Sequence, residues 1–374
     1  MRLKLLALGL AAGVSIGTGA NPAAAQEKAR LEKVAEFPHQ VTGVTVAEDG
    51  RIFVNFPRWT EDSPVSVAEV AKDGSVKPYP DADWNAWRNA KKDELAPQQH
   101  FVCVQSVVAD GRGSLWVLDA AAPAQALIVA GGPKLVKVDL KTNEVSKTIS
   151  FDETAAPQGS YLNDVRFSRD GRHAFITDSG AKGALVVVDL ESGKASRVLD
   201  GHPSTQVEKG LKVTADGKPV VRPDGRGVEF SADGIALSKD GQYLYWQAIK
   251  GTKLYRVPTK DLVETGLGKG MDVADKVEPF GENGVADGLL IGKESGDMYV
   301  SSPEDDSVKL RDLDAGPSGK LEVLVKDERL NWPDTFAEGP DGTVYVTTSH
   351  IPEMSFFKPD APASLPTELW RIAR

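Results

Sequence analysis

Short apolar stretches alternate with turns along almost the whole chain. Each repeating segment joins two stretches of period-two alternation around a turn rich in Asp and Gly, and no long segment shows helical periodicity. This pattern predicts β-structure. The segment recurs six times, as VTGVTVAEDGRIFVNF (41–56), VQSVVADGRGSLWVLD (104–119), NDVRFSRDGRHAFITD (163–178), ADGIALSKDGQYLYWQ (232–247), ADGLLIGKESGDMYVS (286–301) and PDTFAEGPDGTVYVTT (333–348).

A third strand of one shape follows several of these segments, as in KLVKVDLKTNEV and ALVVVDLESGKA. Repeats of about 45 to 60 residues with up to four strands each are typical of propeller blades. We therefore predict an all-β fold, a six-bladed β-propeller. A β-sandwich gives no reason for a sixfold repeat, and a doubly wound α/β fold needs helices for which the Gly- and Pro-rich connections leave little room.

The two ends of the chain each offer one further strand. ARLEKVAEF (29–37) precedes the first repeat, and TELWRIAR (367–374) follows the last. Pairing of these N- and C-terminal strands in one blade would close the ring and cover strand edges that otherwise promote aggregation.

The first 25 residues have the pattern of a signal peptide. Basic residues precede an apolar stretch that runs to about Ile16, and small residues end in Ala23-Ala24-Ala25. A signal peptide has this arrangement and is cleaved from the protein during export. The alternative, a cytosolic protein with an apolar tail, would not explain the A-x-A cleavage site. We expect a secreted or periplasmic protein, cleaved near Ala25, with a single propeller domain over residues 26–374.

Charge and cysteine content narrow the range of partners. The formal net charge is −10 at pH 7, and nucleic acid or an anionic membrane surface demands basic patches instead. No segment after the leader has the roughly 18 uninterrupted apolar residues of a membrane helix. The one cysteine, Cys103, lies in the apolar run FVCV, which predicts a buried core thiol. We expect a monomer that binds a small molecule, and neither nucleic acid nor membrane.

Polar residues occupy one equivalent place near the start of the first strand in most repeats. The first strands of a propeller line its channel and run in one direction, so equivalent residues meet around one mouth. Asp-Gly is also common turn chemistry, and Asp can brace neighbouring blades through backbone amides, so each Asp has a structural alternative. The set comprises Gln105, Asn163 with Asp164, Asp233, Asp287 and Asp334, whereas the first repeat offers only Thr42 and Gly43.

Several carboxylates in a narrow space must bind a cation, share protons or hold solvent. Asp and Asn oxygens suit Ca²⁺ or Mg²⁺, and Mn²⁺ or Zn²⁺ with less preference. One divalent cation, Ca²⁺ first, is therefore the candidate cofactor. The five histidines show no paired spacing. A Gly-rich phosphate loop and a G-x-S-x-G elbow are both missing from the sequence, so no nucleotide or organic cofactor is expected.

Two aromatic positions are weaker candidates. Trp332 directly precedes Pro333-Asp334 and would either roof the mouth, with a flat face for an aromatic ligand, or serve as a packing residue. Arg58-Trp59 is consistent with a cation stacked on a ring in a loop, a structural feature before a functional one.

Several segments together resemble the major royal jelly protein / Yellow family, in its bacterial branch described as L-dopachrome tautomerase-related. They include RIFVNFPRW, VQSVVADGRGSLWVLD, YLNDVRFSRDGRHAFITDSGAKGALVVVDL and LNWPDTFAEGPDGTVYVTT, and the resemblance runs from about residue 30 to 374 in the family's order. It implies a six-bladed propeller. Insect members of the family are secreted; some convert dopachrome, some bind biogenic amines in a central pocket, and others are nutritional or structural.

The strand heads are also similar to those of SMP-30/gluconolactonase propellers, in which an acidic residue, Asn and Asp hold a divalent metal. On that pattern Asn163 and Asp233 would be the metal ligands, with Asp287 or Asp334 nearby. The first repeat departs from the pattern, because the lactonases place a Glu ligand early in the chain and Thr42-Gly43 provides none.

Three functions are compatible with these features. The first is an enzyme, tautomerase- or lactonase-like, that acts on a small cyclic or aromatic metabolite in the channel. Asp233 and Asp287 would be its catalytic proton carriers, and Asn163 or a metal would polarise a carbonyl. The second is a binding protein for a small amine or aromatic ligand, and the third a scaffold for protein partners. The expected ligand contacts are Gln105, Asn163, Asp164, Trp332 and Asp334.

Overall fold

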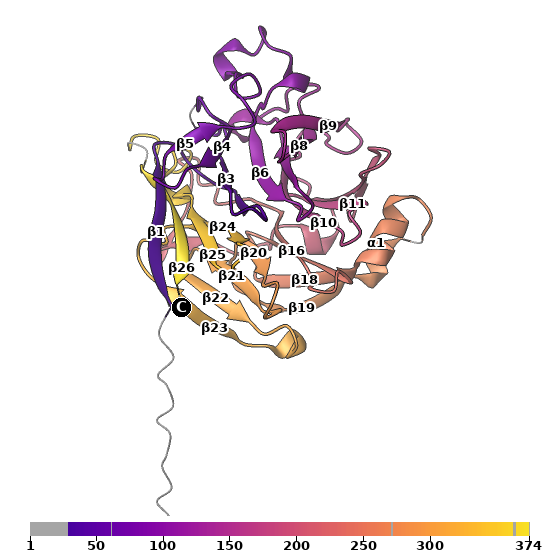
Figure 1. Ribbon diagram of the computed structural model, residues 1–374. Helices are drawn as coiled ribbons and strands as arrows, with labels where there is room; N and C mark the ends of the chain where they lie inside the picture. The colour runs from indigo at the N-terminus through magenta and orange to yellow at the C-terminus, as the bar shows by residue number, and fades with distance from the viewer. Residues whose placement is uncertain (1–28, 61, 271, 362–363, 374) are drawn as a thin grey trace, which may run out of the picture.

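The computed structural model describes residues 29–60, 62–270, 272–361 and 364–373. The predicted signal peptide at residues 1–25 lies outside them. Six four-stranded antiparallel sheets form the blades of a β-propeller (Figure 1), which confirms the predicted fold class.

Five blades each use four strands that pair in chain order, from the channel outward. Their inner two strands are those of the sequence repeat, because the turn between them is short. Blade 1 contains β2 (Val44–Val46), β3 (Ile52–Asn55), β4 (Val67–Val70) and β5 (Val76–Pro78). Blade 2 contains β6 (Val104–Ala109), β7 (Ser114–Asp119), β8 (Lys134–Asp139) and β9 (Glu144–Ser150). Blade 3 contains β10 (Leu162–Phe167), β11 (His173–Asp178), β12 (Ala184–Asp189) and β13 (Ala195–Val198). Blade 4 contains β16 (Ala232–Leu237), β17 (Tyr243–Ala248), β18 (Lys253–Pro258) and β19 (Glu278–Glu282), and blade 5 contains β20 (Leu289–Ile291), β21 (Met298–Ser302), β22 (Ser307–Arg311) and β23 (Leu321–Lys326).

The sixth blade joins the two ends of the chain. β1 (Arg30–Phe37) pairs with β26 (Thr367–Ala373), which pairs in turn with β25 (Val344–Thr348) and the innermost β24 (Pro333–Glu338). In Figure 1 the indigo β1 lies beside the yellow β26. The register sets Arg30 opposite Ala373 and Phe37 opposite Thr367. The predicted closure by terminal strands is therefore confirmed.

The hydrophobic core lies between neighbouring blades, because successive side chains of a strand point to opposite faces of its sheet. Leu118 of blade 2 and Val165 of blade 3 belong to one buried cluster. Phe175 of blade 3 and Trp246 of blade 4 belong to the next. Each blade thus shares its core with two neighbours.

The connections contain elements that the repeat did not predict. The helix α1 (Thr259–Gly266) lies between β18 and β19, and the hairpin of β14 (Thr214–Ala215) and β15 (Lys218–Pro219) lies between blades 3 and 4. Neither this helix nor any other described one has both the length and the apolar character to cross a membrane. Short 3-10 helices complete the connections, at Asn89–Lys91, Pro97–Gln99, Pro123–Gln125, Pro203–Thr205, Val273–Lys276, Gly316–Ser318 and Ile351–Glu353.

Loops from every blade meet in one apolar cluster, which we call the mouth cluster. It covers the end of the channel at which the inner strands begin. Its buried members are Trp59, Cys103, Ala120, Ala122, Ile128, Tyr161, Val213, Val220, Val228, Ile249, Val285, Trp332, Ile351, Met354 and Phe357. Cys103 is fully buried there, as predicted.

Candidate functional site

The inner strands open with an irregularity that exposes their polar residues to the channel. The antiparallel register shifts between Leu162 and Val165, between Ala232 and Ile235, and between Pro333 and Phe336. Such a bulge leaves residues outside the ladder and re-aims their side chains. The residues displaced in this way are Asn163, Asp164, Asp233 and Asp334, and an equivalent shift in blade 2 lies at Gln105.

Hydroxyl groups of the second strands hold these irregular segments in place. Thr177 Oγ1 accepts a hydrogen bond from the Asp164 amide (3.2 Å) and donates one to the carbonyl of Asp233 in the next blade (2.6 Å). Ser301 Oγ accepts from the amides of Asp287 (3.0 Å) and Gly288 (2.9 Å). Backbone amides that lack a strand partner are thereby satisfied, and neighbouring blades are fixed to each other at the level of the carboxyl groups.

One cavity gathers most of the predicted residues. The space between its walls, mouth included, is about 260 Å³, and only about 20 Å³ of it admits the centre of a water molecule. As it stands the cavity therefore has room for about one or two water molecules, and a ring-sized ligand requires its walls to move. Its lining comprises the predicted Gln105, Asn163, Asp233, Asp287 and Asp334 together with Trp59, Gln125, Tyr161, Ser179, Phe230, Ile249 and Ile351.

Asp233 and Asp287 form a hydrogen-bonded carboxyl pair. Burial, followed by the charge of Asp287, raises the pKa of Asp233 well above its ordinary range. Burial also raises the pKa of Asp287, to about 7, against the lowering effect of a hydrogen bond from Trp332. Two adjacent carboxyl groups cannot both ionise cheaply, so one proton is shared between them. The pair therefore keeps one proton over a pH range in which two isolated carboxyl groups would both be ionised.

Trp332 acts on the cavity through this pair. Its indole Nε1 donates to Asp287 Oδ2 over 2.6 Å, and the side chain is only 1% exposed. The backbone of Trp332 lies in the left-handed region (φ 56°), a costly conformation for a bulky residue that is common at functional sites. Trp332 therefore offers no open ring face to a ligand, and its contact with the cavity is the hydrogen bond to Asp287.

Asp334 and Asp164 complete the carboxyl group set. Burial, with the charge of Asp287 second, raises the pKa of Asp334 well above its ordinary range. Burial also raises the pKa of Asp164, although the Arg166 guanidinium at 3.7 Å opposes the shift. Arg166 is a positive charge that the pattern of strand heads did not reveal. Asp164 thus pairs with an arginine, and it is the one predicted carboxyl group absent from the cavity lining given above.

The aromatic wall of the cavity was not predicted as a site. Trp59 Nε1 donates to the Tyr161 hydroxyl, and that hydroxyl donates to Gln105 Oε1 (3.0 Å). Arg58, the other half of the suggested stacked pair, is fully buried and donates to Ser66 Oγ (2.5 Å) and to nearby backbone carbonyls. One feature of the sequence indicated that these two residues lie near the channel: Trp59 follows the repeat at 41–56 by three residues, and Tyr161 precedes the repeat at 163–178 by two.

The predicted donor set lacks one part of a lactonase-type metal centre. Asn163 and Asp233 do line one cavity, but the carboxyl group of Asp233 is engaged with Asp287. In blade 1, Thr42 Oγ1 accepts a hydrogen bond from Asn55 (2.9 Å) and supplies no carboxylate. Across the described ranges, no three His, Cys, Asp or Glu side chains are placed to hold one metal ion. The divalent cation stays a prediction, and a proton shared by Asp233 and Asp287 is the alternative.

Comparison with solved structures supports the fold. A gluconolactonase from Xanthomonas campestris is 14% identical, with a TM-score of 0.55 and coverage of 92% of this chain and 89% of that one. A luciferin-regenerating enzyme is 11% identical, with a TM-score of 0.56 and coverage of 92% and 95%. A calcium-binding protein, regucalcin, from Agrobacterium tumefaciens is 14% identical, with a TM-score of 0.51 and coverage of 91% and 94%.

Sequence comparison identifies the family. No curated protein matches the chain significantly. The family model described as major royal jelly protein matches residues 102–356, more than half of the chain. This match includes the inner strands of blades 2 to 6 and all the cavity residues except Trp59. The chain therefore belongs to the major royal jelly protein family.

Proposed function

We propose that this protein is an enzyme that moves a proton on a small cyclic or aromatic carbonyl compound held in its channel. The observation that carries the proposal is the carboxyl pair of Asp233 and Asp287 in the wall of a narrow cavity. General acid–base catalysis is most efficient when the pKa of the catalytic group lies near the working pH. The pKa of Asp287, at about 7, meets this condition.

The pair supplies a base and an acid side by side. Ionised Asp287 would take a proton from a carbon next to a carbonyl, or from a water molecule that attacks a lactone carbonyl. Protonated Asp233 would give its proton to the oxygen that gains charge, which leaves the pair with one proton, as before. Tautomerisation needs the first reaction and lactone hydrolysis the second. The same residues therefore support both chemistries.

The remaining cavity residues would position the substrate. Asn163 is 5% exposed and lines the cavity, so its amide would hold a substrate oxygen. The rings of Trp59 and Tyr161 and the half-buried Phe230 offer a flat apolar wall. The gluconolactonase shares the fold at 14% identity, and its name is in keeping with the lactone reaction of this proposal.

Binding of an amine is the alternative that the cavity supports less well. A ring of ionised carboxylates would attract a cation, but burial raises the pKa of Asp233 and of Asp334 and so disfavours their charged forms. Export, which rests on the leader pattern, and the expectation of neither nucleic-acid nor membrane partners, which rests on the net charge of −10, remain part of the proposal, as does a monomeric state.

Turnover of a panel of dopachrome and five- and six-membered lactones tests the proposal. Asp233→Asn and Asp287→Asn should each lower kcat at least about 100-fold, the usual contribution of a positioned acid or base. Asp170→Asn, in an exposed turn where the carboxylate accepts from Ser168 Oγ, is the matched control and should keep full activity. Undiminished turnover in both cavity variants, or no turnover of any compound by the wild-type protein, would reject the enzyme.

A further inference from the structure

The Trp59, Tyr161 and Gln105 side chains form a relay whose hydrogen-bond direction is fixed by chemistry. An indole N–H can only donate, so the Tyr161 oxygen must accept from Trp59 Nε1. The Tyr161 proton must then go to another acceptor. Gln105 Oε1 is 3.0 Å away, whereas the sulfur of Cys103, a weaker acceptor, is 3.8 Å away.

This direction decides which end of the Gln105 amide faces the cavity. Because Oε1 accepts from Tyr161, the Nε2 group with its two N–H donors is left for the cavity that Gln105 lines. No partner for this nitrogen occurs among the residues of the described ranges. Gln125 lines the same cavity, and its Nε2 is buried without a partner in the described structure. An unpaired buried donor costs about 1–3 kcal/mol, so the Gln125 amide requires an acceptor, and the Gln105 amide is placed to share it.

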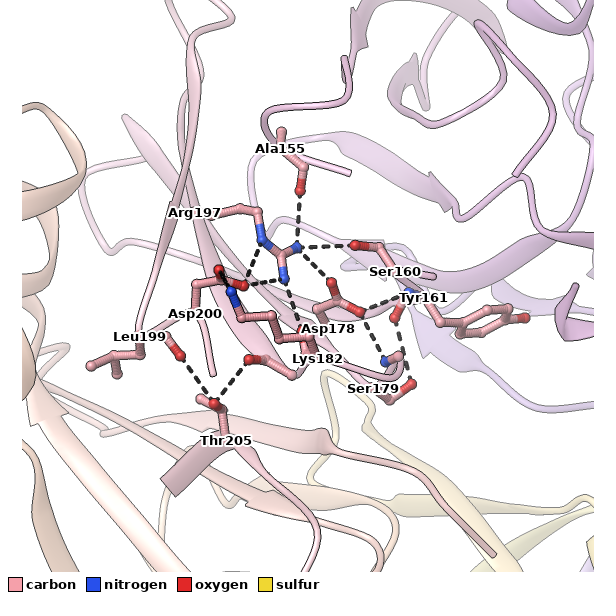
Figure 2. Close-up of polar contacts among 12 residues, drawn as sticks. Ala155, Ser160, Tyr161, Asp178, Ser179, Lys182, Arg197, Leu199, Asp200 and Thr205 are labelled. Atoms are coloured by element: carbon pink, nitrogen blue, oxygen red, sulfur yellow. Dashed lines mark hydrogen bonds and ion pairs between the residues drawn. The ribbon is translucent and has the colours of Figure 1, made fainter. Parts of the chain in front are cut away.

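The relay is held from behind by a buried ion pair. Asp178 Oδ1 accepts from the amide of Tyr161 (2.7 Å), and Asp178 Oδ2 is 2.5 Å from Arg197 Nη1. Ser179 donates its amide to the Tyr161 carbonyl (3.0 Å). Figure 2 shows these contacts around the Tyr161 backbone, with the Tyr161 ring pointing away from them. The phenol is thus anchored by its own main chain, and the hydroxyl has little freedom to leave Gln105.

We propose that the Gln105 and Gln125 amides bind an acceptor oxygen of the ligand, and that Trp59 and Tyr161 are positioning residues that select a carbonyl group over an ammonium group. The inference rests on the proposed function only for the location of the ligand. It deepens that function by naming the ligand chemistry, an uncharged or anionic oxygen acceptor. An ammonium group in the same place would face N–H donors and leave them unpaired.

Two probes that differ only in the polar group test the selection. Cyclohexanone carries a carbonyl and cyclohexylamine, at neutral pH, an ammonium group on the same six-membered ring. Binding is measured by thermal shift and calorimetry, since a ligand of the native state raises its stability. The wild-type protein should bind cyclohexanone at least about tenfold more tightly. Tyr161→Phe and Gln105→Met should lower that preference about tenfold, and Trp59→Phe should lower it in the same direction.

Tyr79→Phe is the matched control. Its hydroxyl also donates to a side-chain amide oxygen, Asn143 Oδ1 at 3.0 Å, but in blade 1 outside the cavity lining. Tyr79→Phe should lower the stability of the folded protein without changing its preference for cyclohexanone over cyclohexylamine. Preference for cyclohexylammonium, an unchanged ratio in Tyr161→Phe, or binding of neither probe would overturn the inference. Asp233→Asn should lower kcat at least about 100-fold yet keep the preference, so failure of the enzyme proposal is visible separately.

Discussion

Gly234 lies directly against the backbone of Asp287 in the next blade. A Cβ atom at position 234 would stand 2.2 Å from the Asp287 carbonyl oxygen, closer than real atoms approach. The inner strands of blades 4 and 5 can therefore meet only because residue 234 has no side chain. This close approach brings the carboxyl groups of Asp233 and Asp287 within hydrogen-bonding reach of each other. In the Asp233-Gly234 pair, the aspartate thus supplies a carboxyl group to the channel, and the glycine allows the two inner strands to pack closely.

Gly234→Ala should separate the carboxyl pair. Backbone has to move to admit the methyl group, and such overpacking costs about 1–3 kcal/mol in the free energy of unfolding. Activity should fall further than stability, because the pair depends on the spacing of the strands. Denaturant unfolding and turnover measure the two effects. Gly227→Ala, whose Cβ would meet only an ordinary 3.6 Å contact, is the control. Full activity of Gly234→Ala would contradict the role assigned to this contact.

The repeat pattern was sufficient to predict the fold and much of one wall of the site. Alternation and turn residues act locally, so the six hairpins and the closing strands could be located directly from the sequence. Equivalent positions in a ring must meet, which placed Gln105, Asn163, Asp233, Asp287 and Asp334 in one cavity. No pairing of distant segments had to be guessed for this result, because the symmetry of the fold supplied it.

The other wall could not be predicted, because it comes from the irregular connections. Trp59, Tyr161 and Gln125 lie outside the repeat, and nothing in their local sequence states which loops fold over the mouth. The sharing of a proton by Asp233 and Asp287 was one of three options for crowded carboxylates. The choice depends on burial and on the hydrogen bond from Trp332, which are tertiary properties.

Trp332→Phe should shift the pH dependence of the enzyme. The indole N–H stabilises ionised Asp287, so its removal should raise the pKa of Asp287 above the value of about 7. The rising limb of the pH–rate profile should move to higher pH by the same amount. Trp246→Phe is the control, because it also loses a buried indole donor, to the Ser204 carbonyl at 3.0 Å in blade 4. An unmoved limb in Trp332→Phe would show that Asp287 is not the base.

The buried carboxyl groups should make the protein less stable as pH rises. The pKa of Asp287 is about 7 in the folded state, above the ordinary value of about 3.9 in the unfolded chain. The folded state therefore binds more protons between these values, and stability is greatest below about pH 4 and falls through pH 7 for this group. The loss is at most about 1.4 kcal/mol per pH unit. Asp287→Asn should remove this slope, which thermal unfolding at pH 5 and pH 8 would measure; an equal slope in the variant would contradict it.

Metal removal should leave the protein unchanged at neutral pH. A cation between Asp233 and Asp287 has to displace the proton that they share, so Ca²⁺ binding should strengthen as pH rises and release a proton. Dialysis against a chelator should change neither Tm nor turnover at pH 7. Metal analysis before dialysis and calorimetry with Ca²⁺ in buffers of different ionisation enthalpy check this. A stoichiometric ion whose removal lowers Tm would instead favour the lactonase-type centre.

The β14–β15 hairpin is attached to blade 5 by acidic residues. The amide and hydroxyl of Thr214 donate to Glu304 Oε1 over 2.9 and 2.8 Å, and the side chains of Asp216 and Asp306 are hydrogen-bonded to each other. Val213 and Val220, at the two ends of the hairpin, belong to the mouth cluster. The attachment of the hairpin therefore bears on access to the cavity.

Asp306→Asn should keep the β14–β15 hairpin attached to blade 5 at all pH values. Partial burial, followed by the charges of Asp216 and Asp305, raises the pKa of Asp306 to about 6 in spite of Lys326. A raised pKa means that the attached state is favoured while the proton is present, so attachment should weaken as pH rises through 6. Amide exchange of residues 214–218 should be faster in wild type than in Asp306→Asn at pH 8, and equal in the two at pH 5. Asp224→Asn, whose carboxylate pairs with Arg226 in an exposed turn, should behave as wild type. Equal exchange of wild type and Asp306→Asn at pH 8 would show that the Asp216–Asp306 contact does not govern the hairpin.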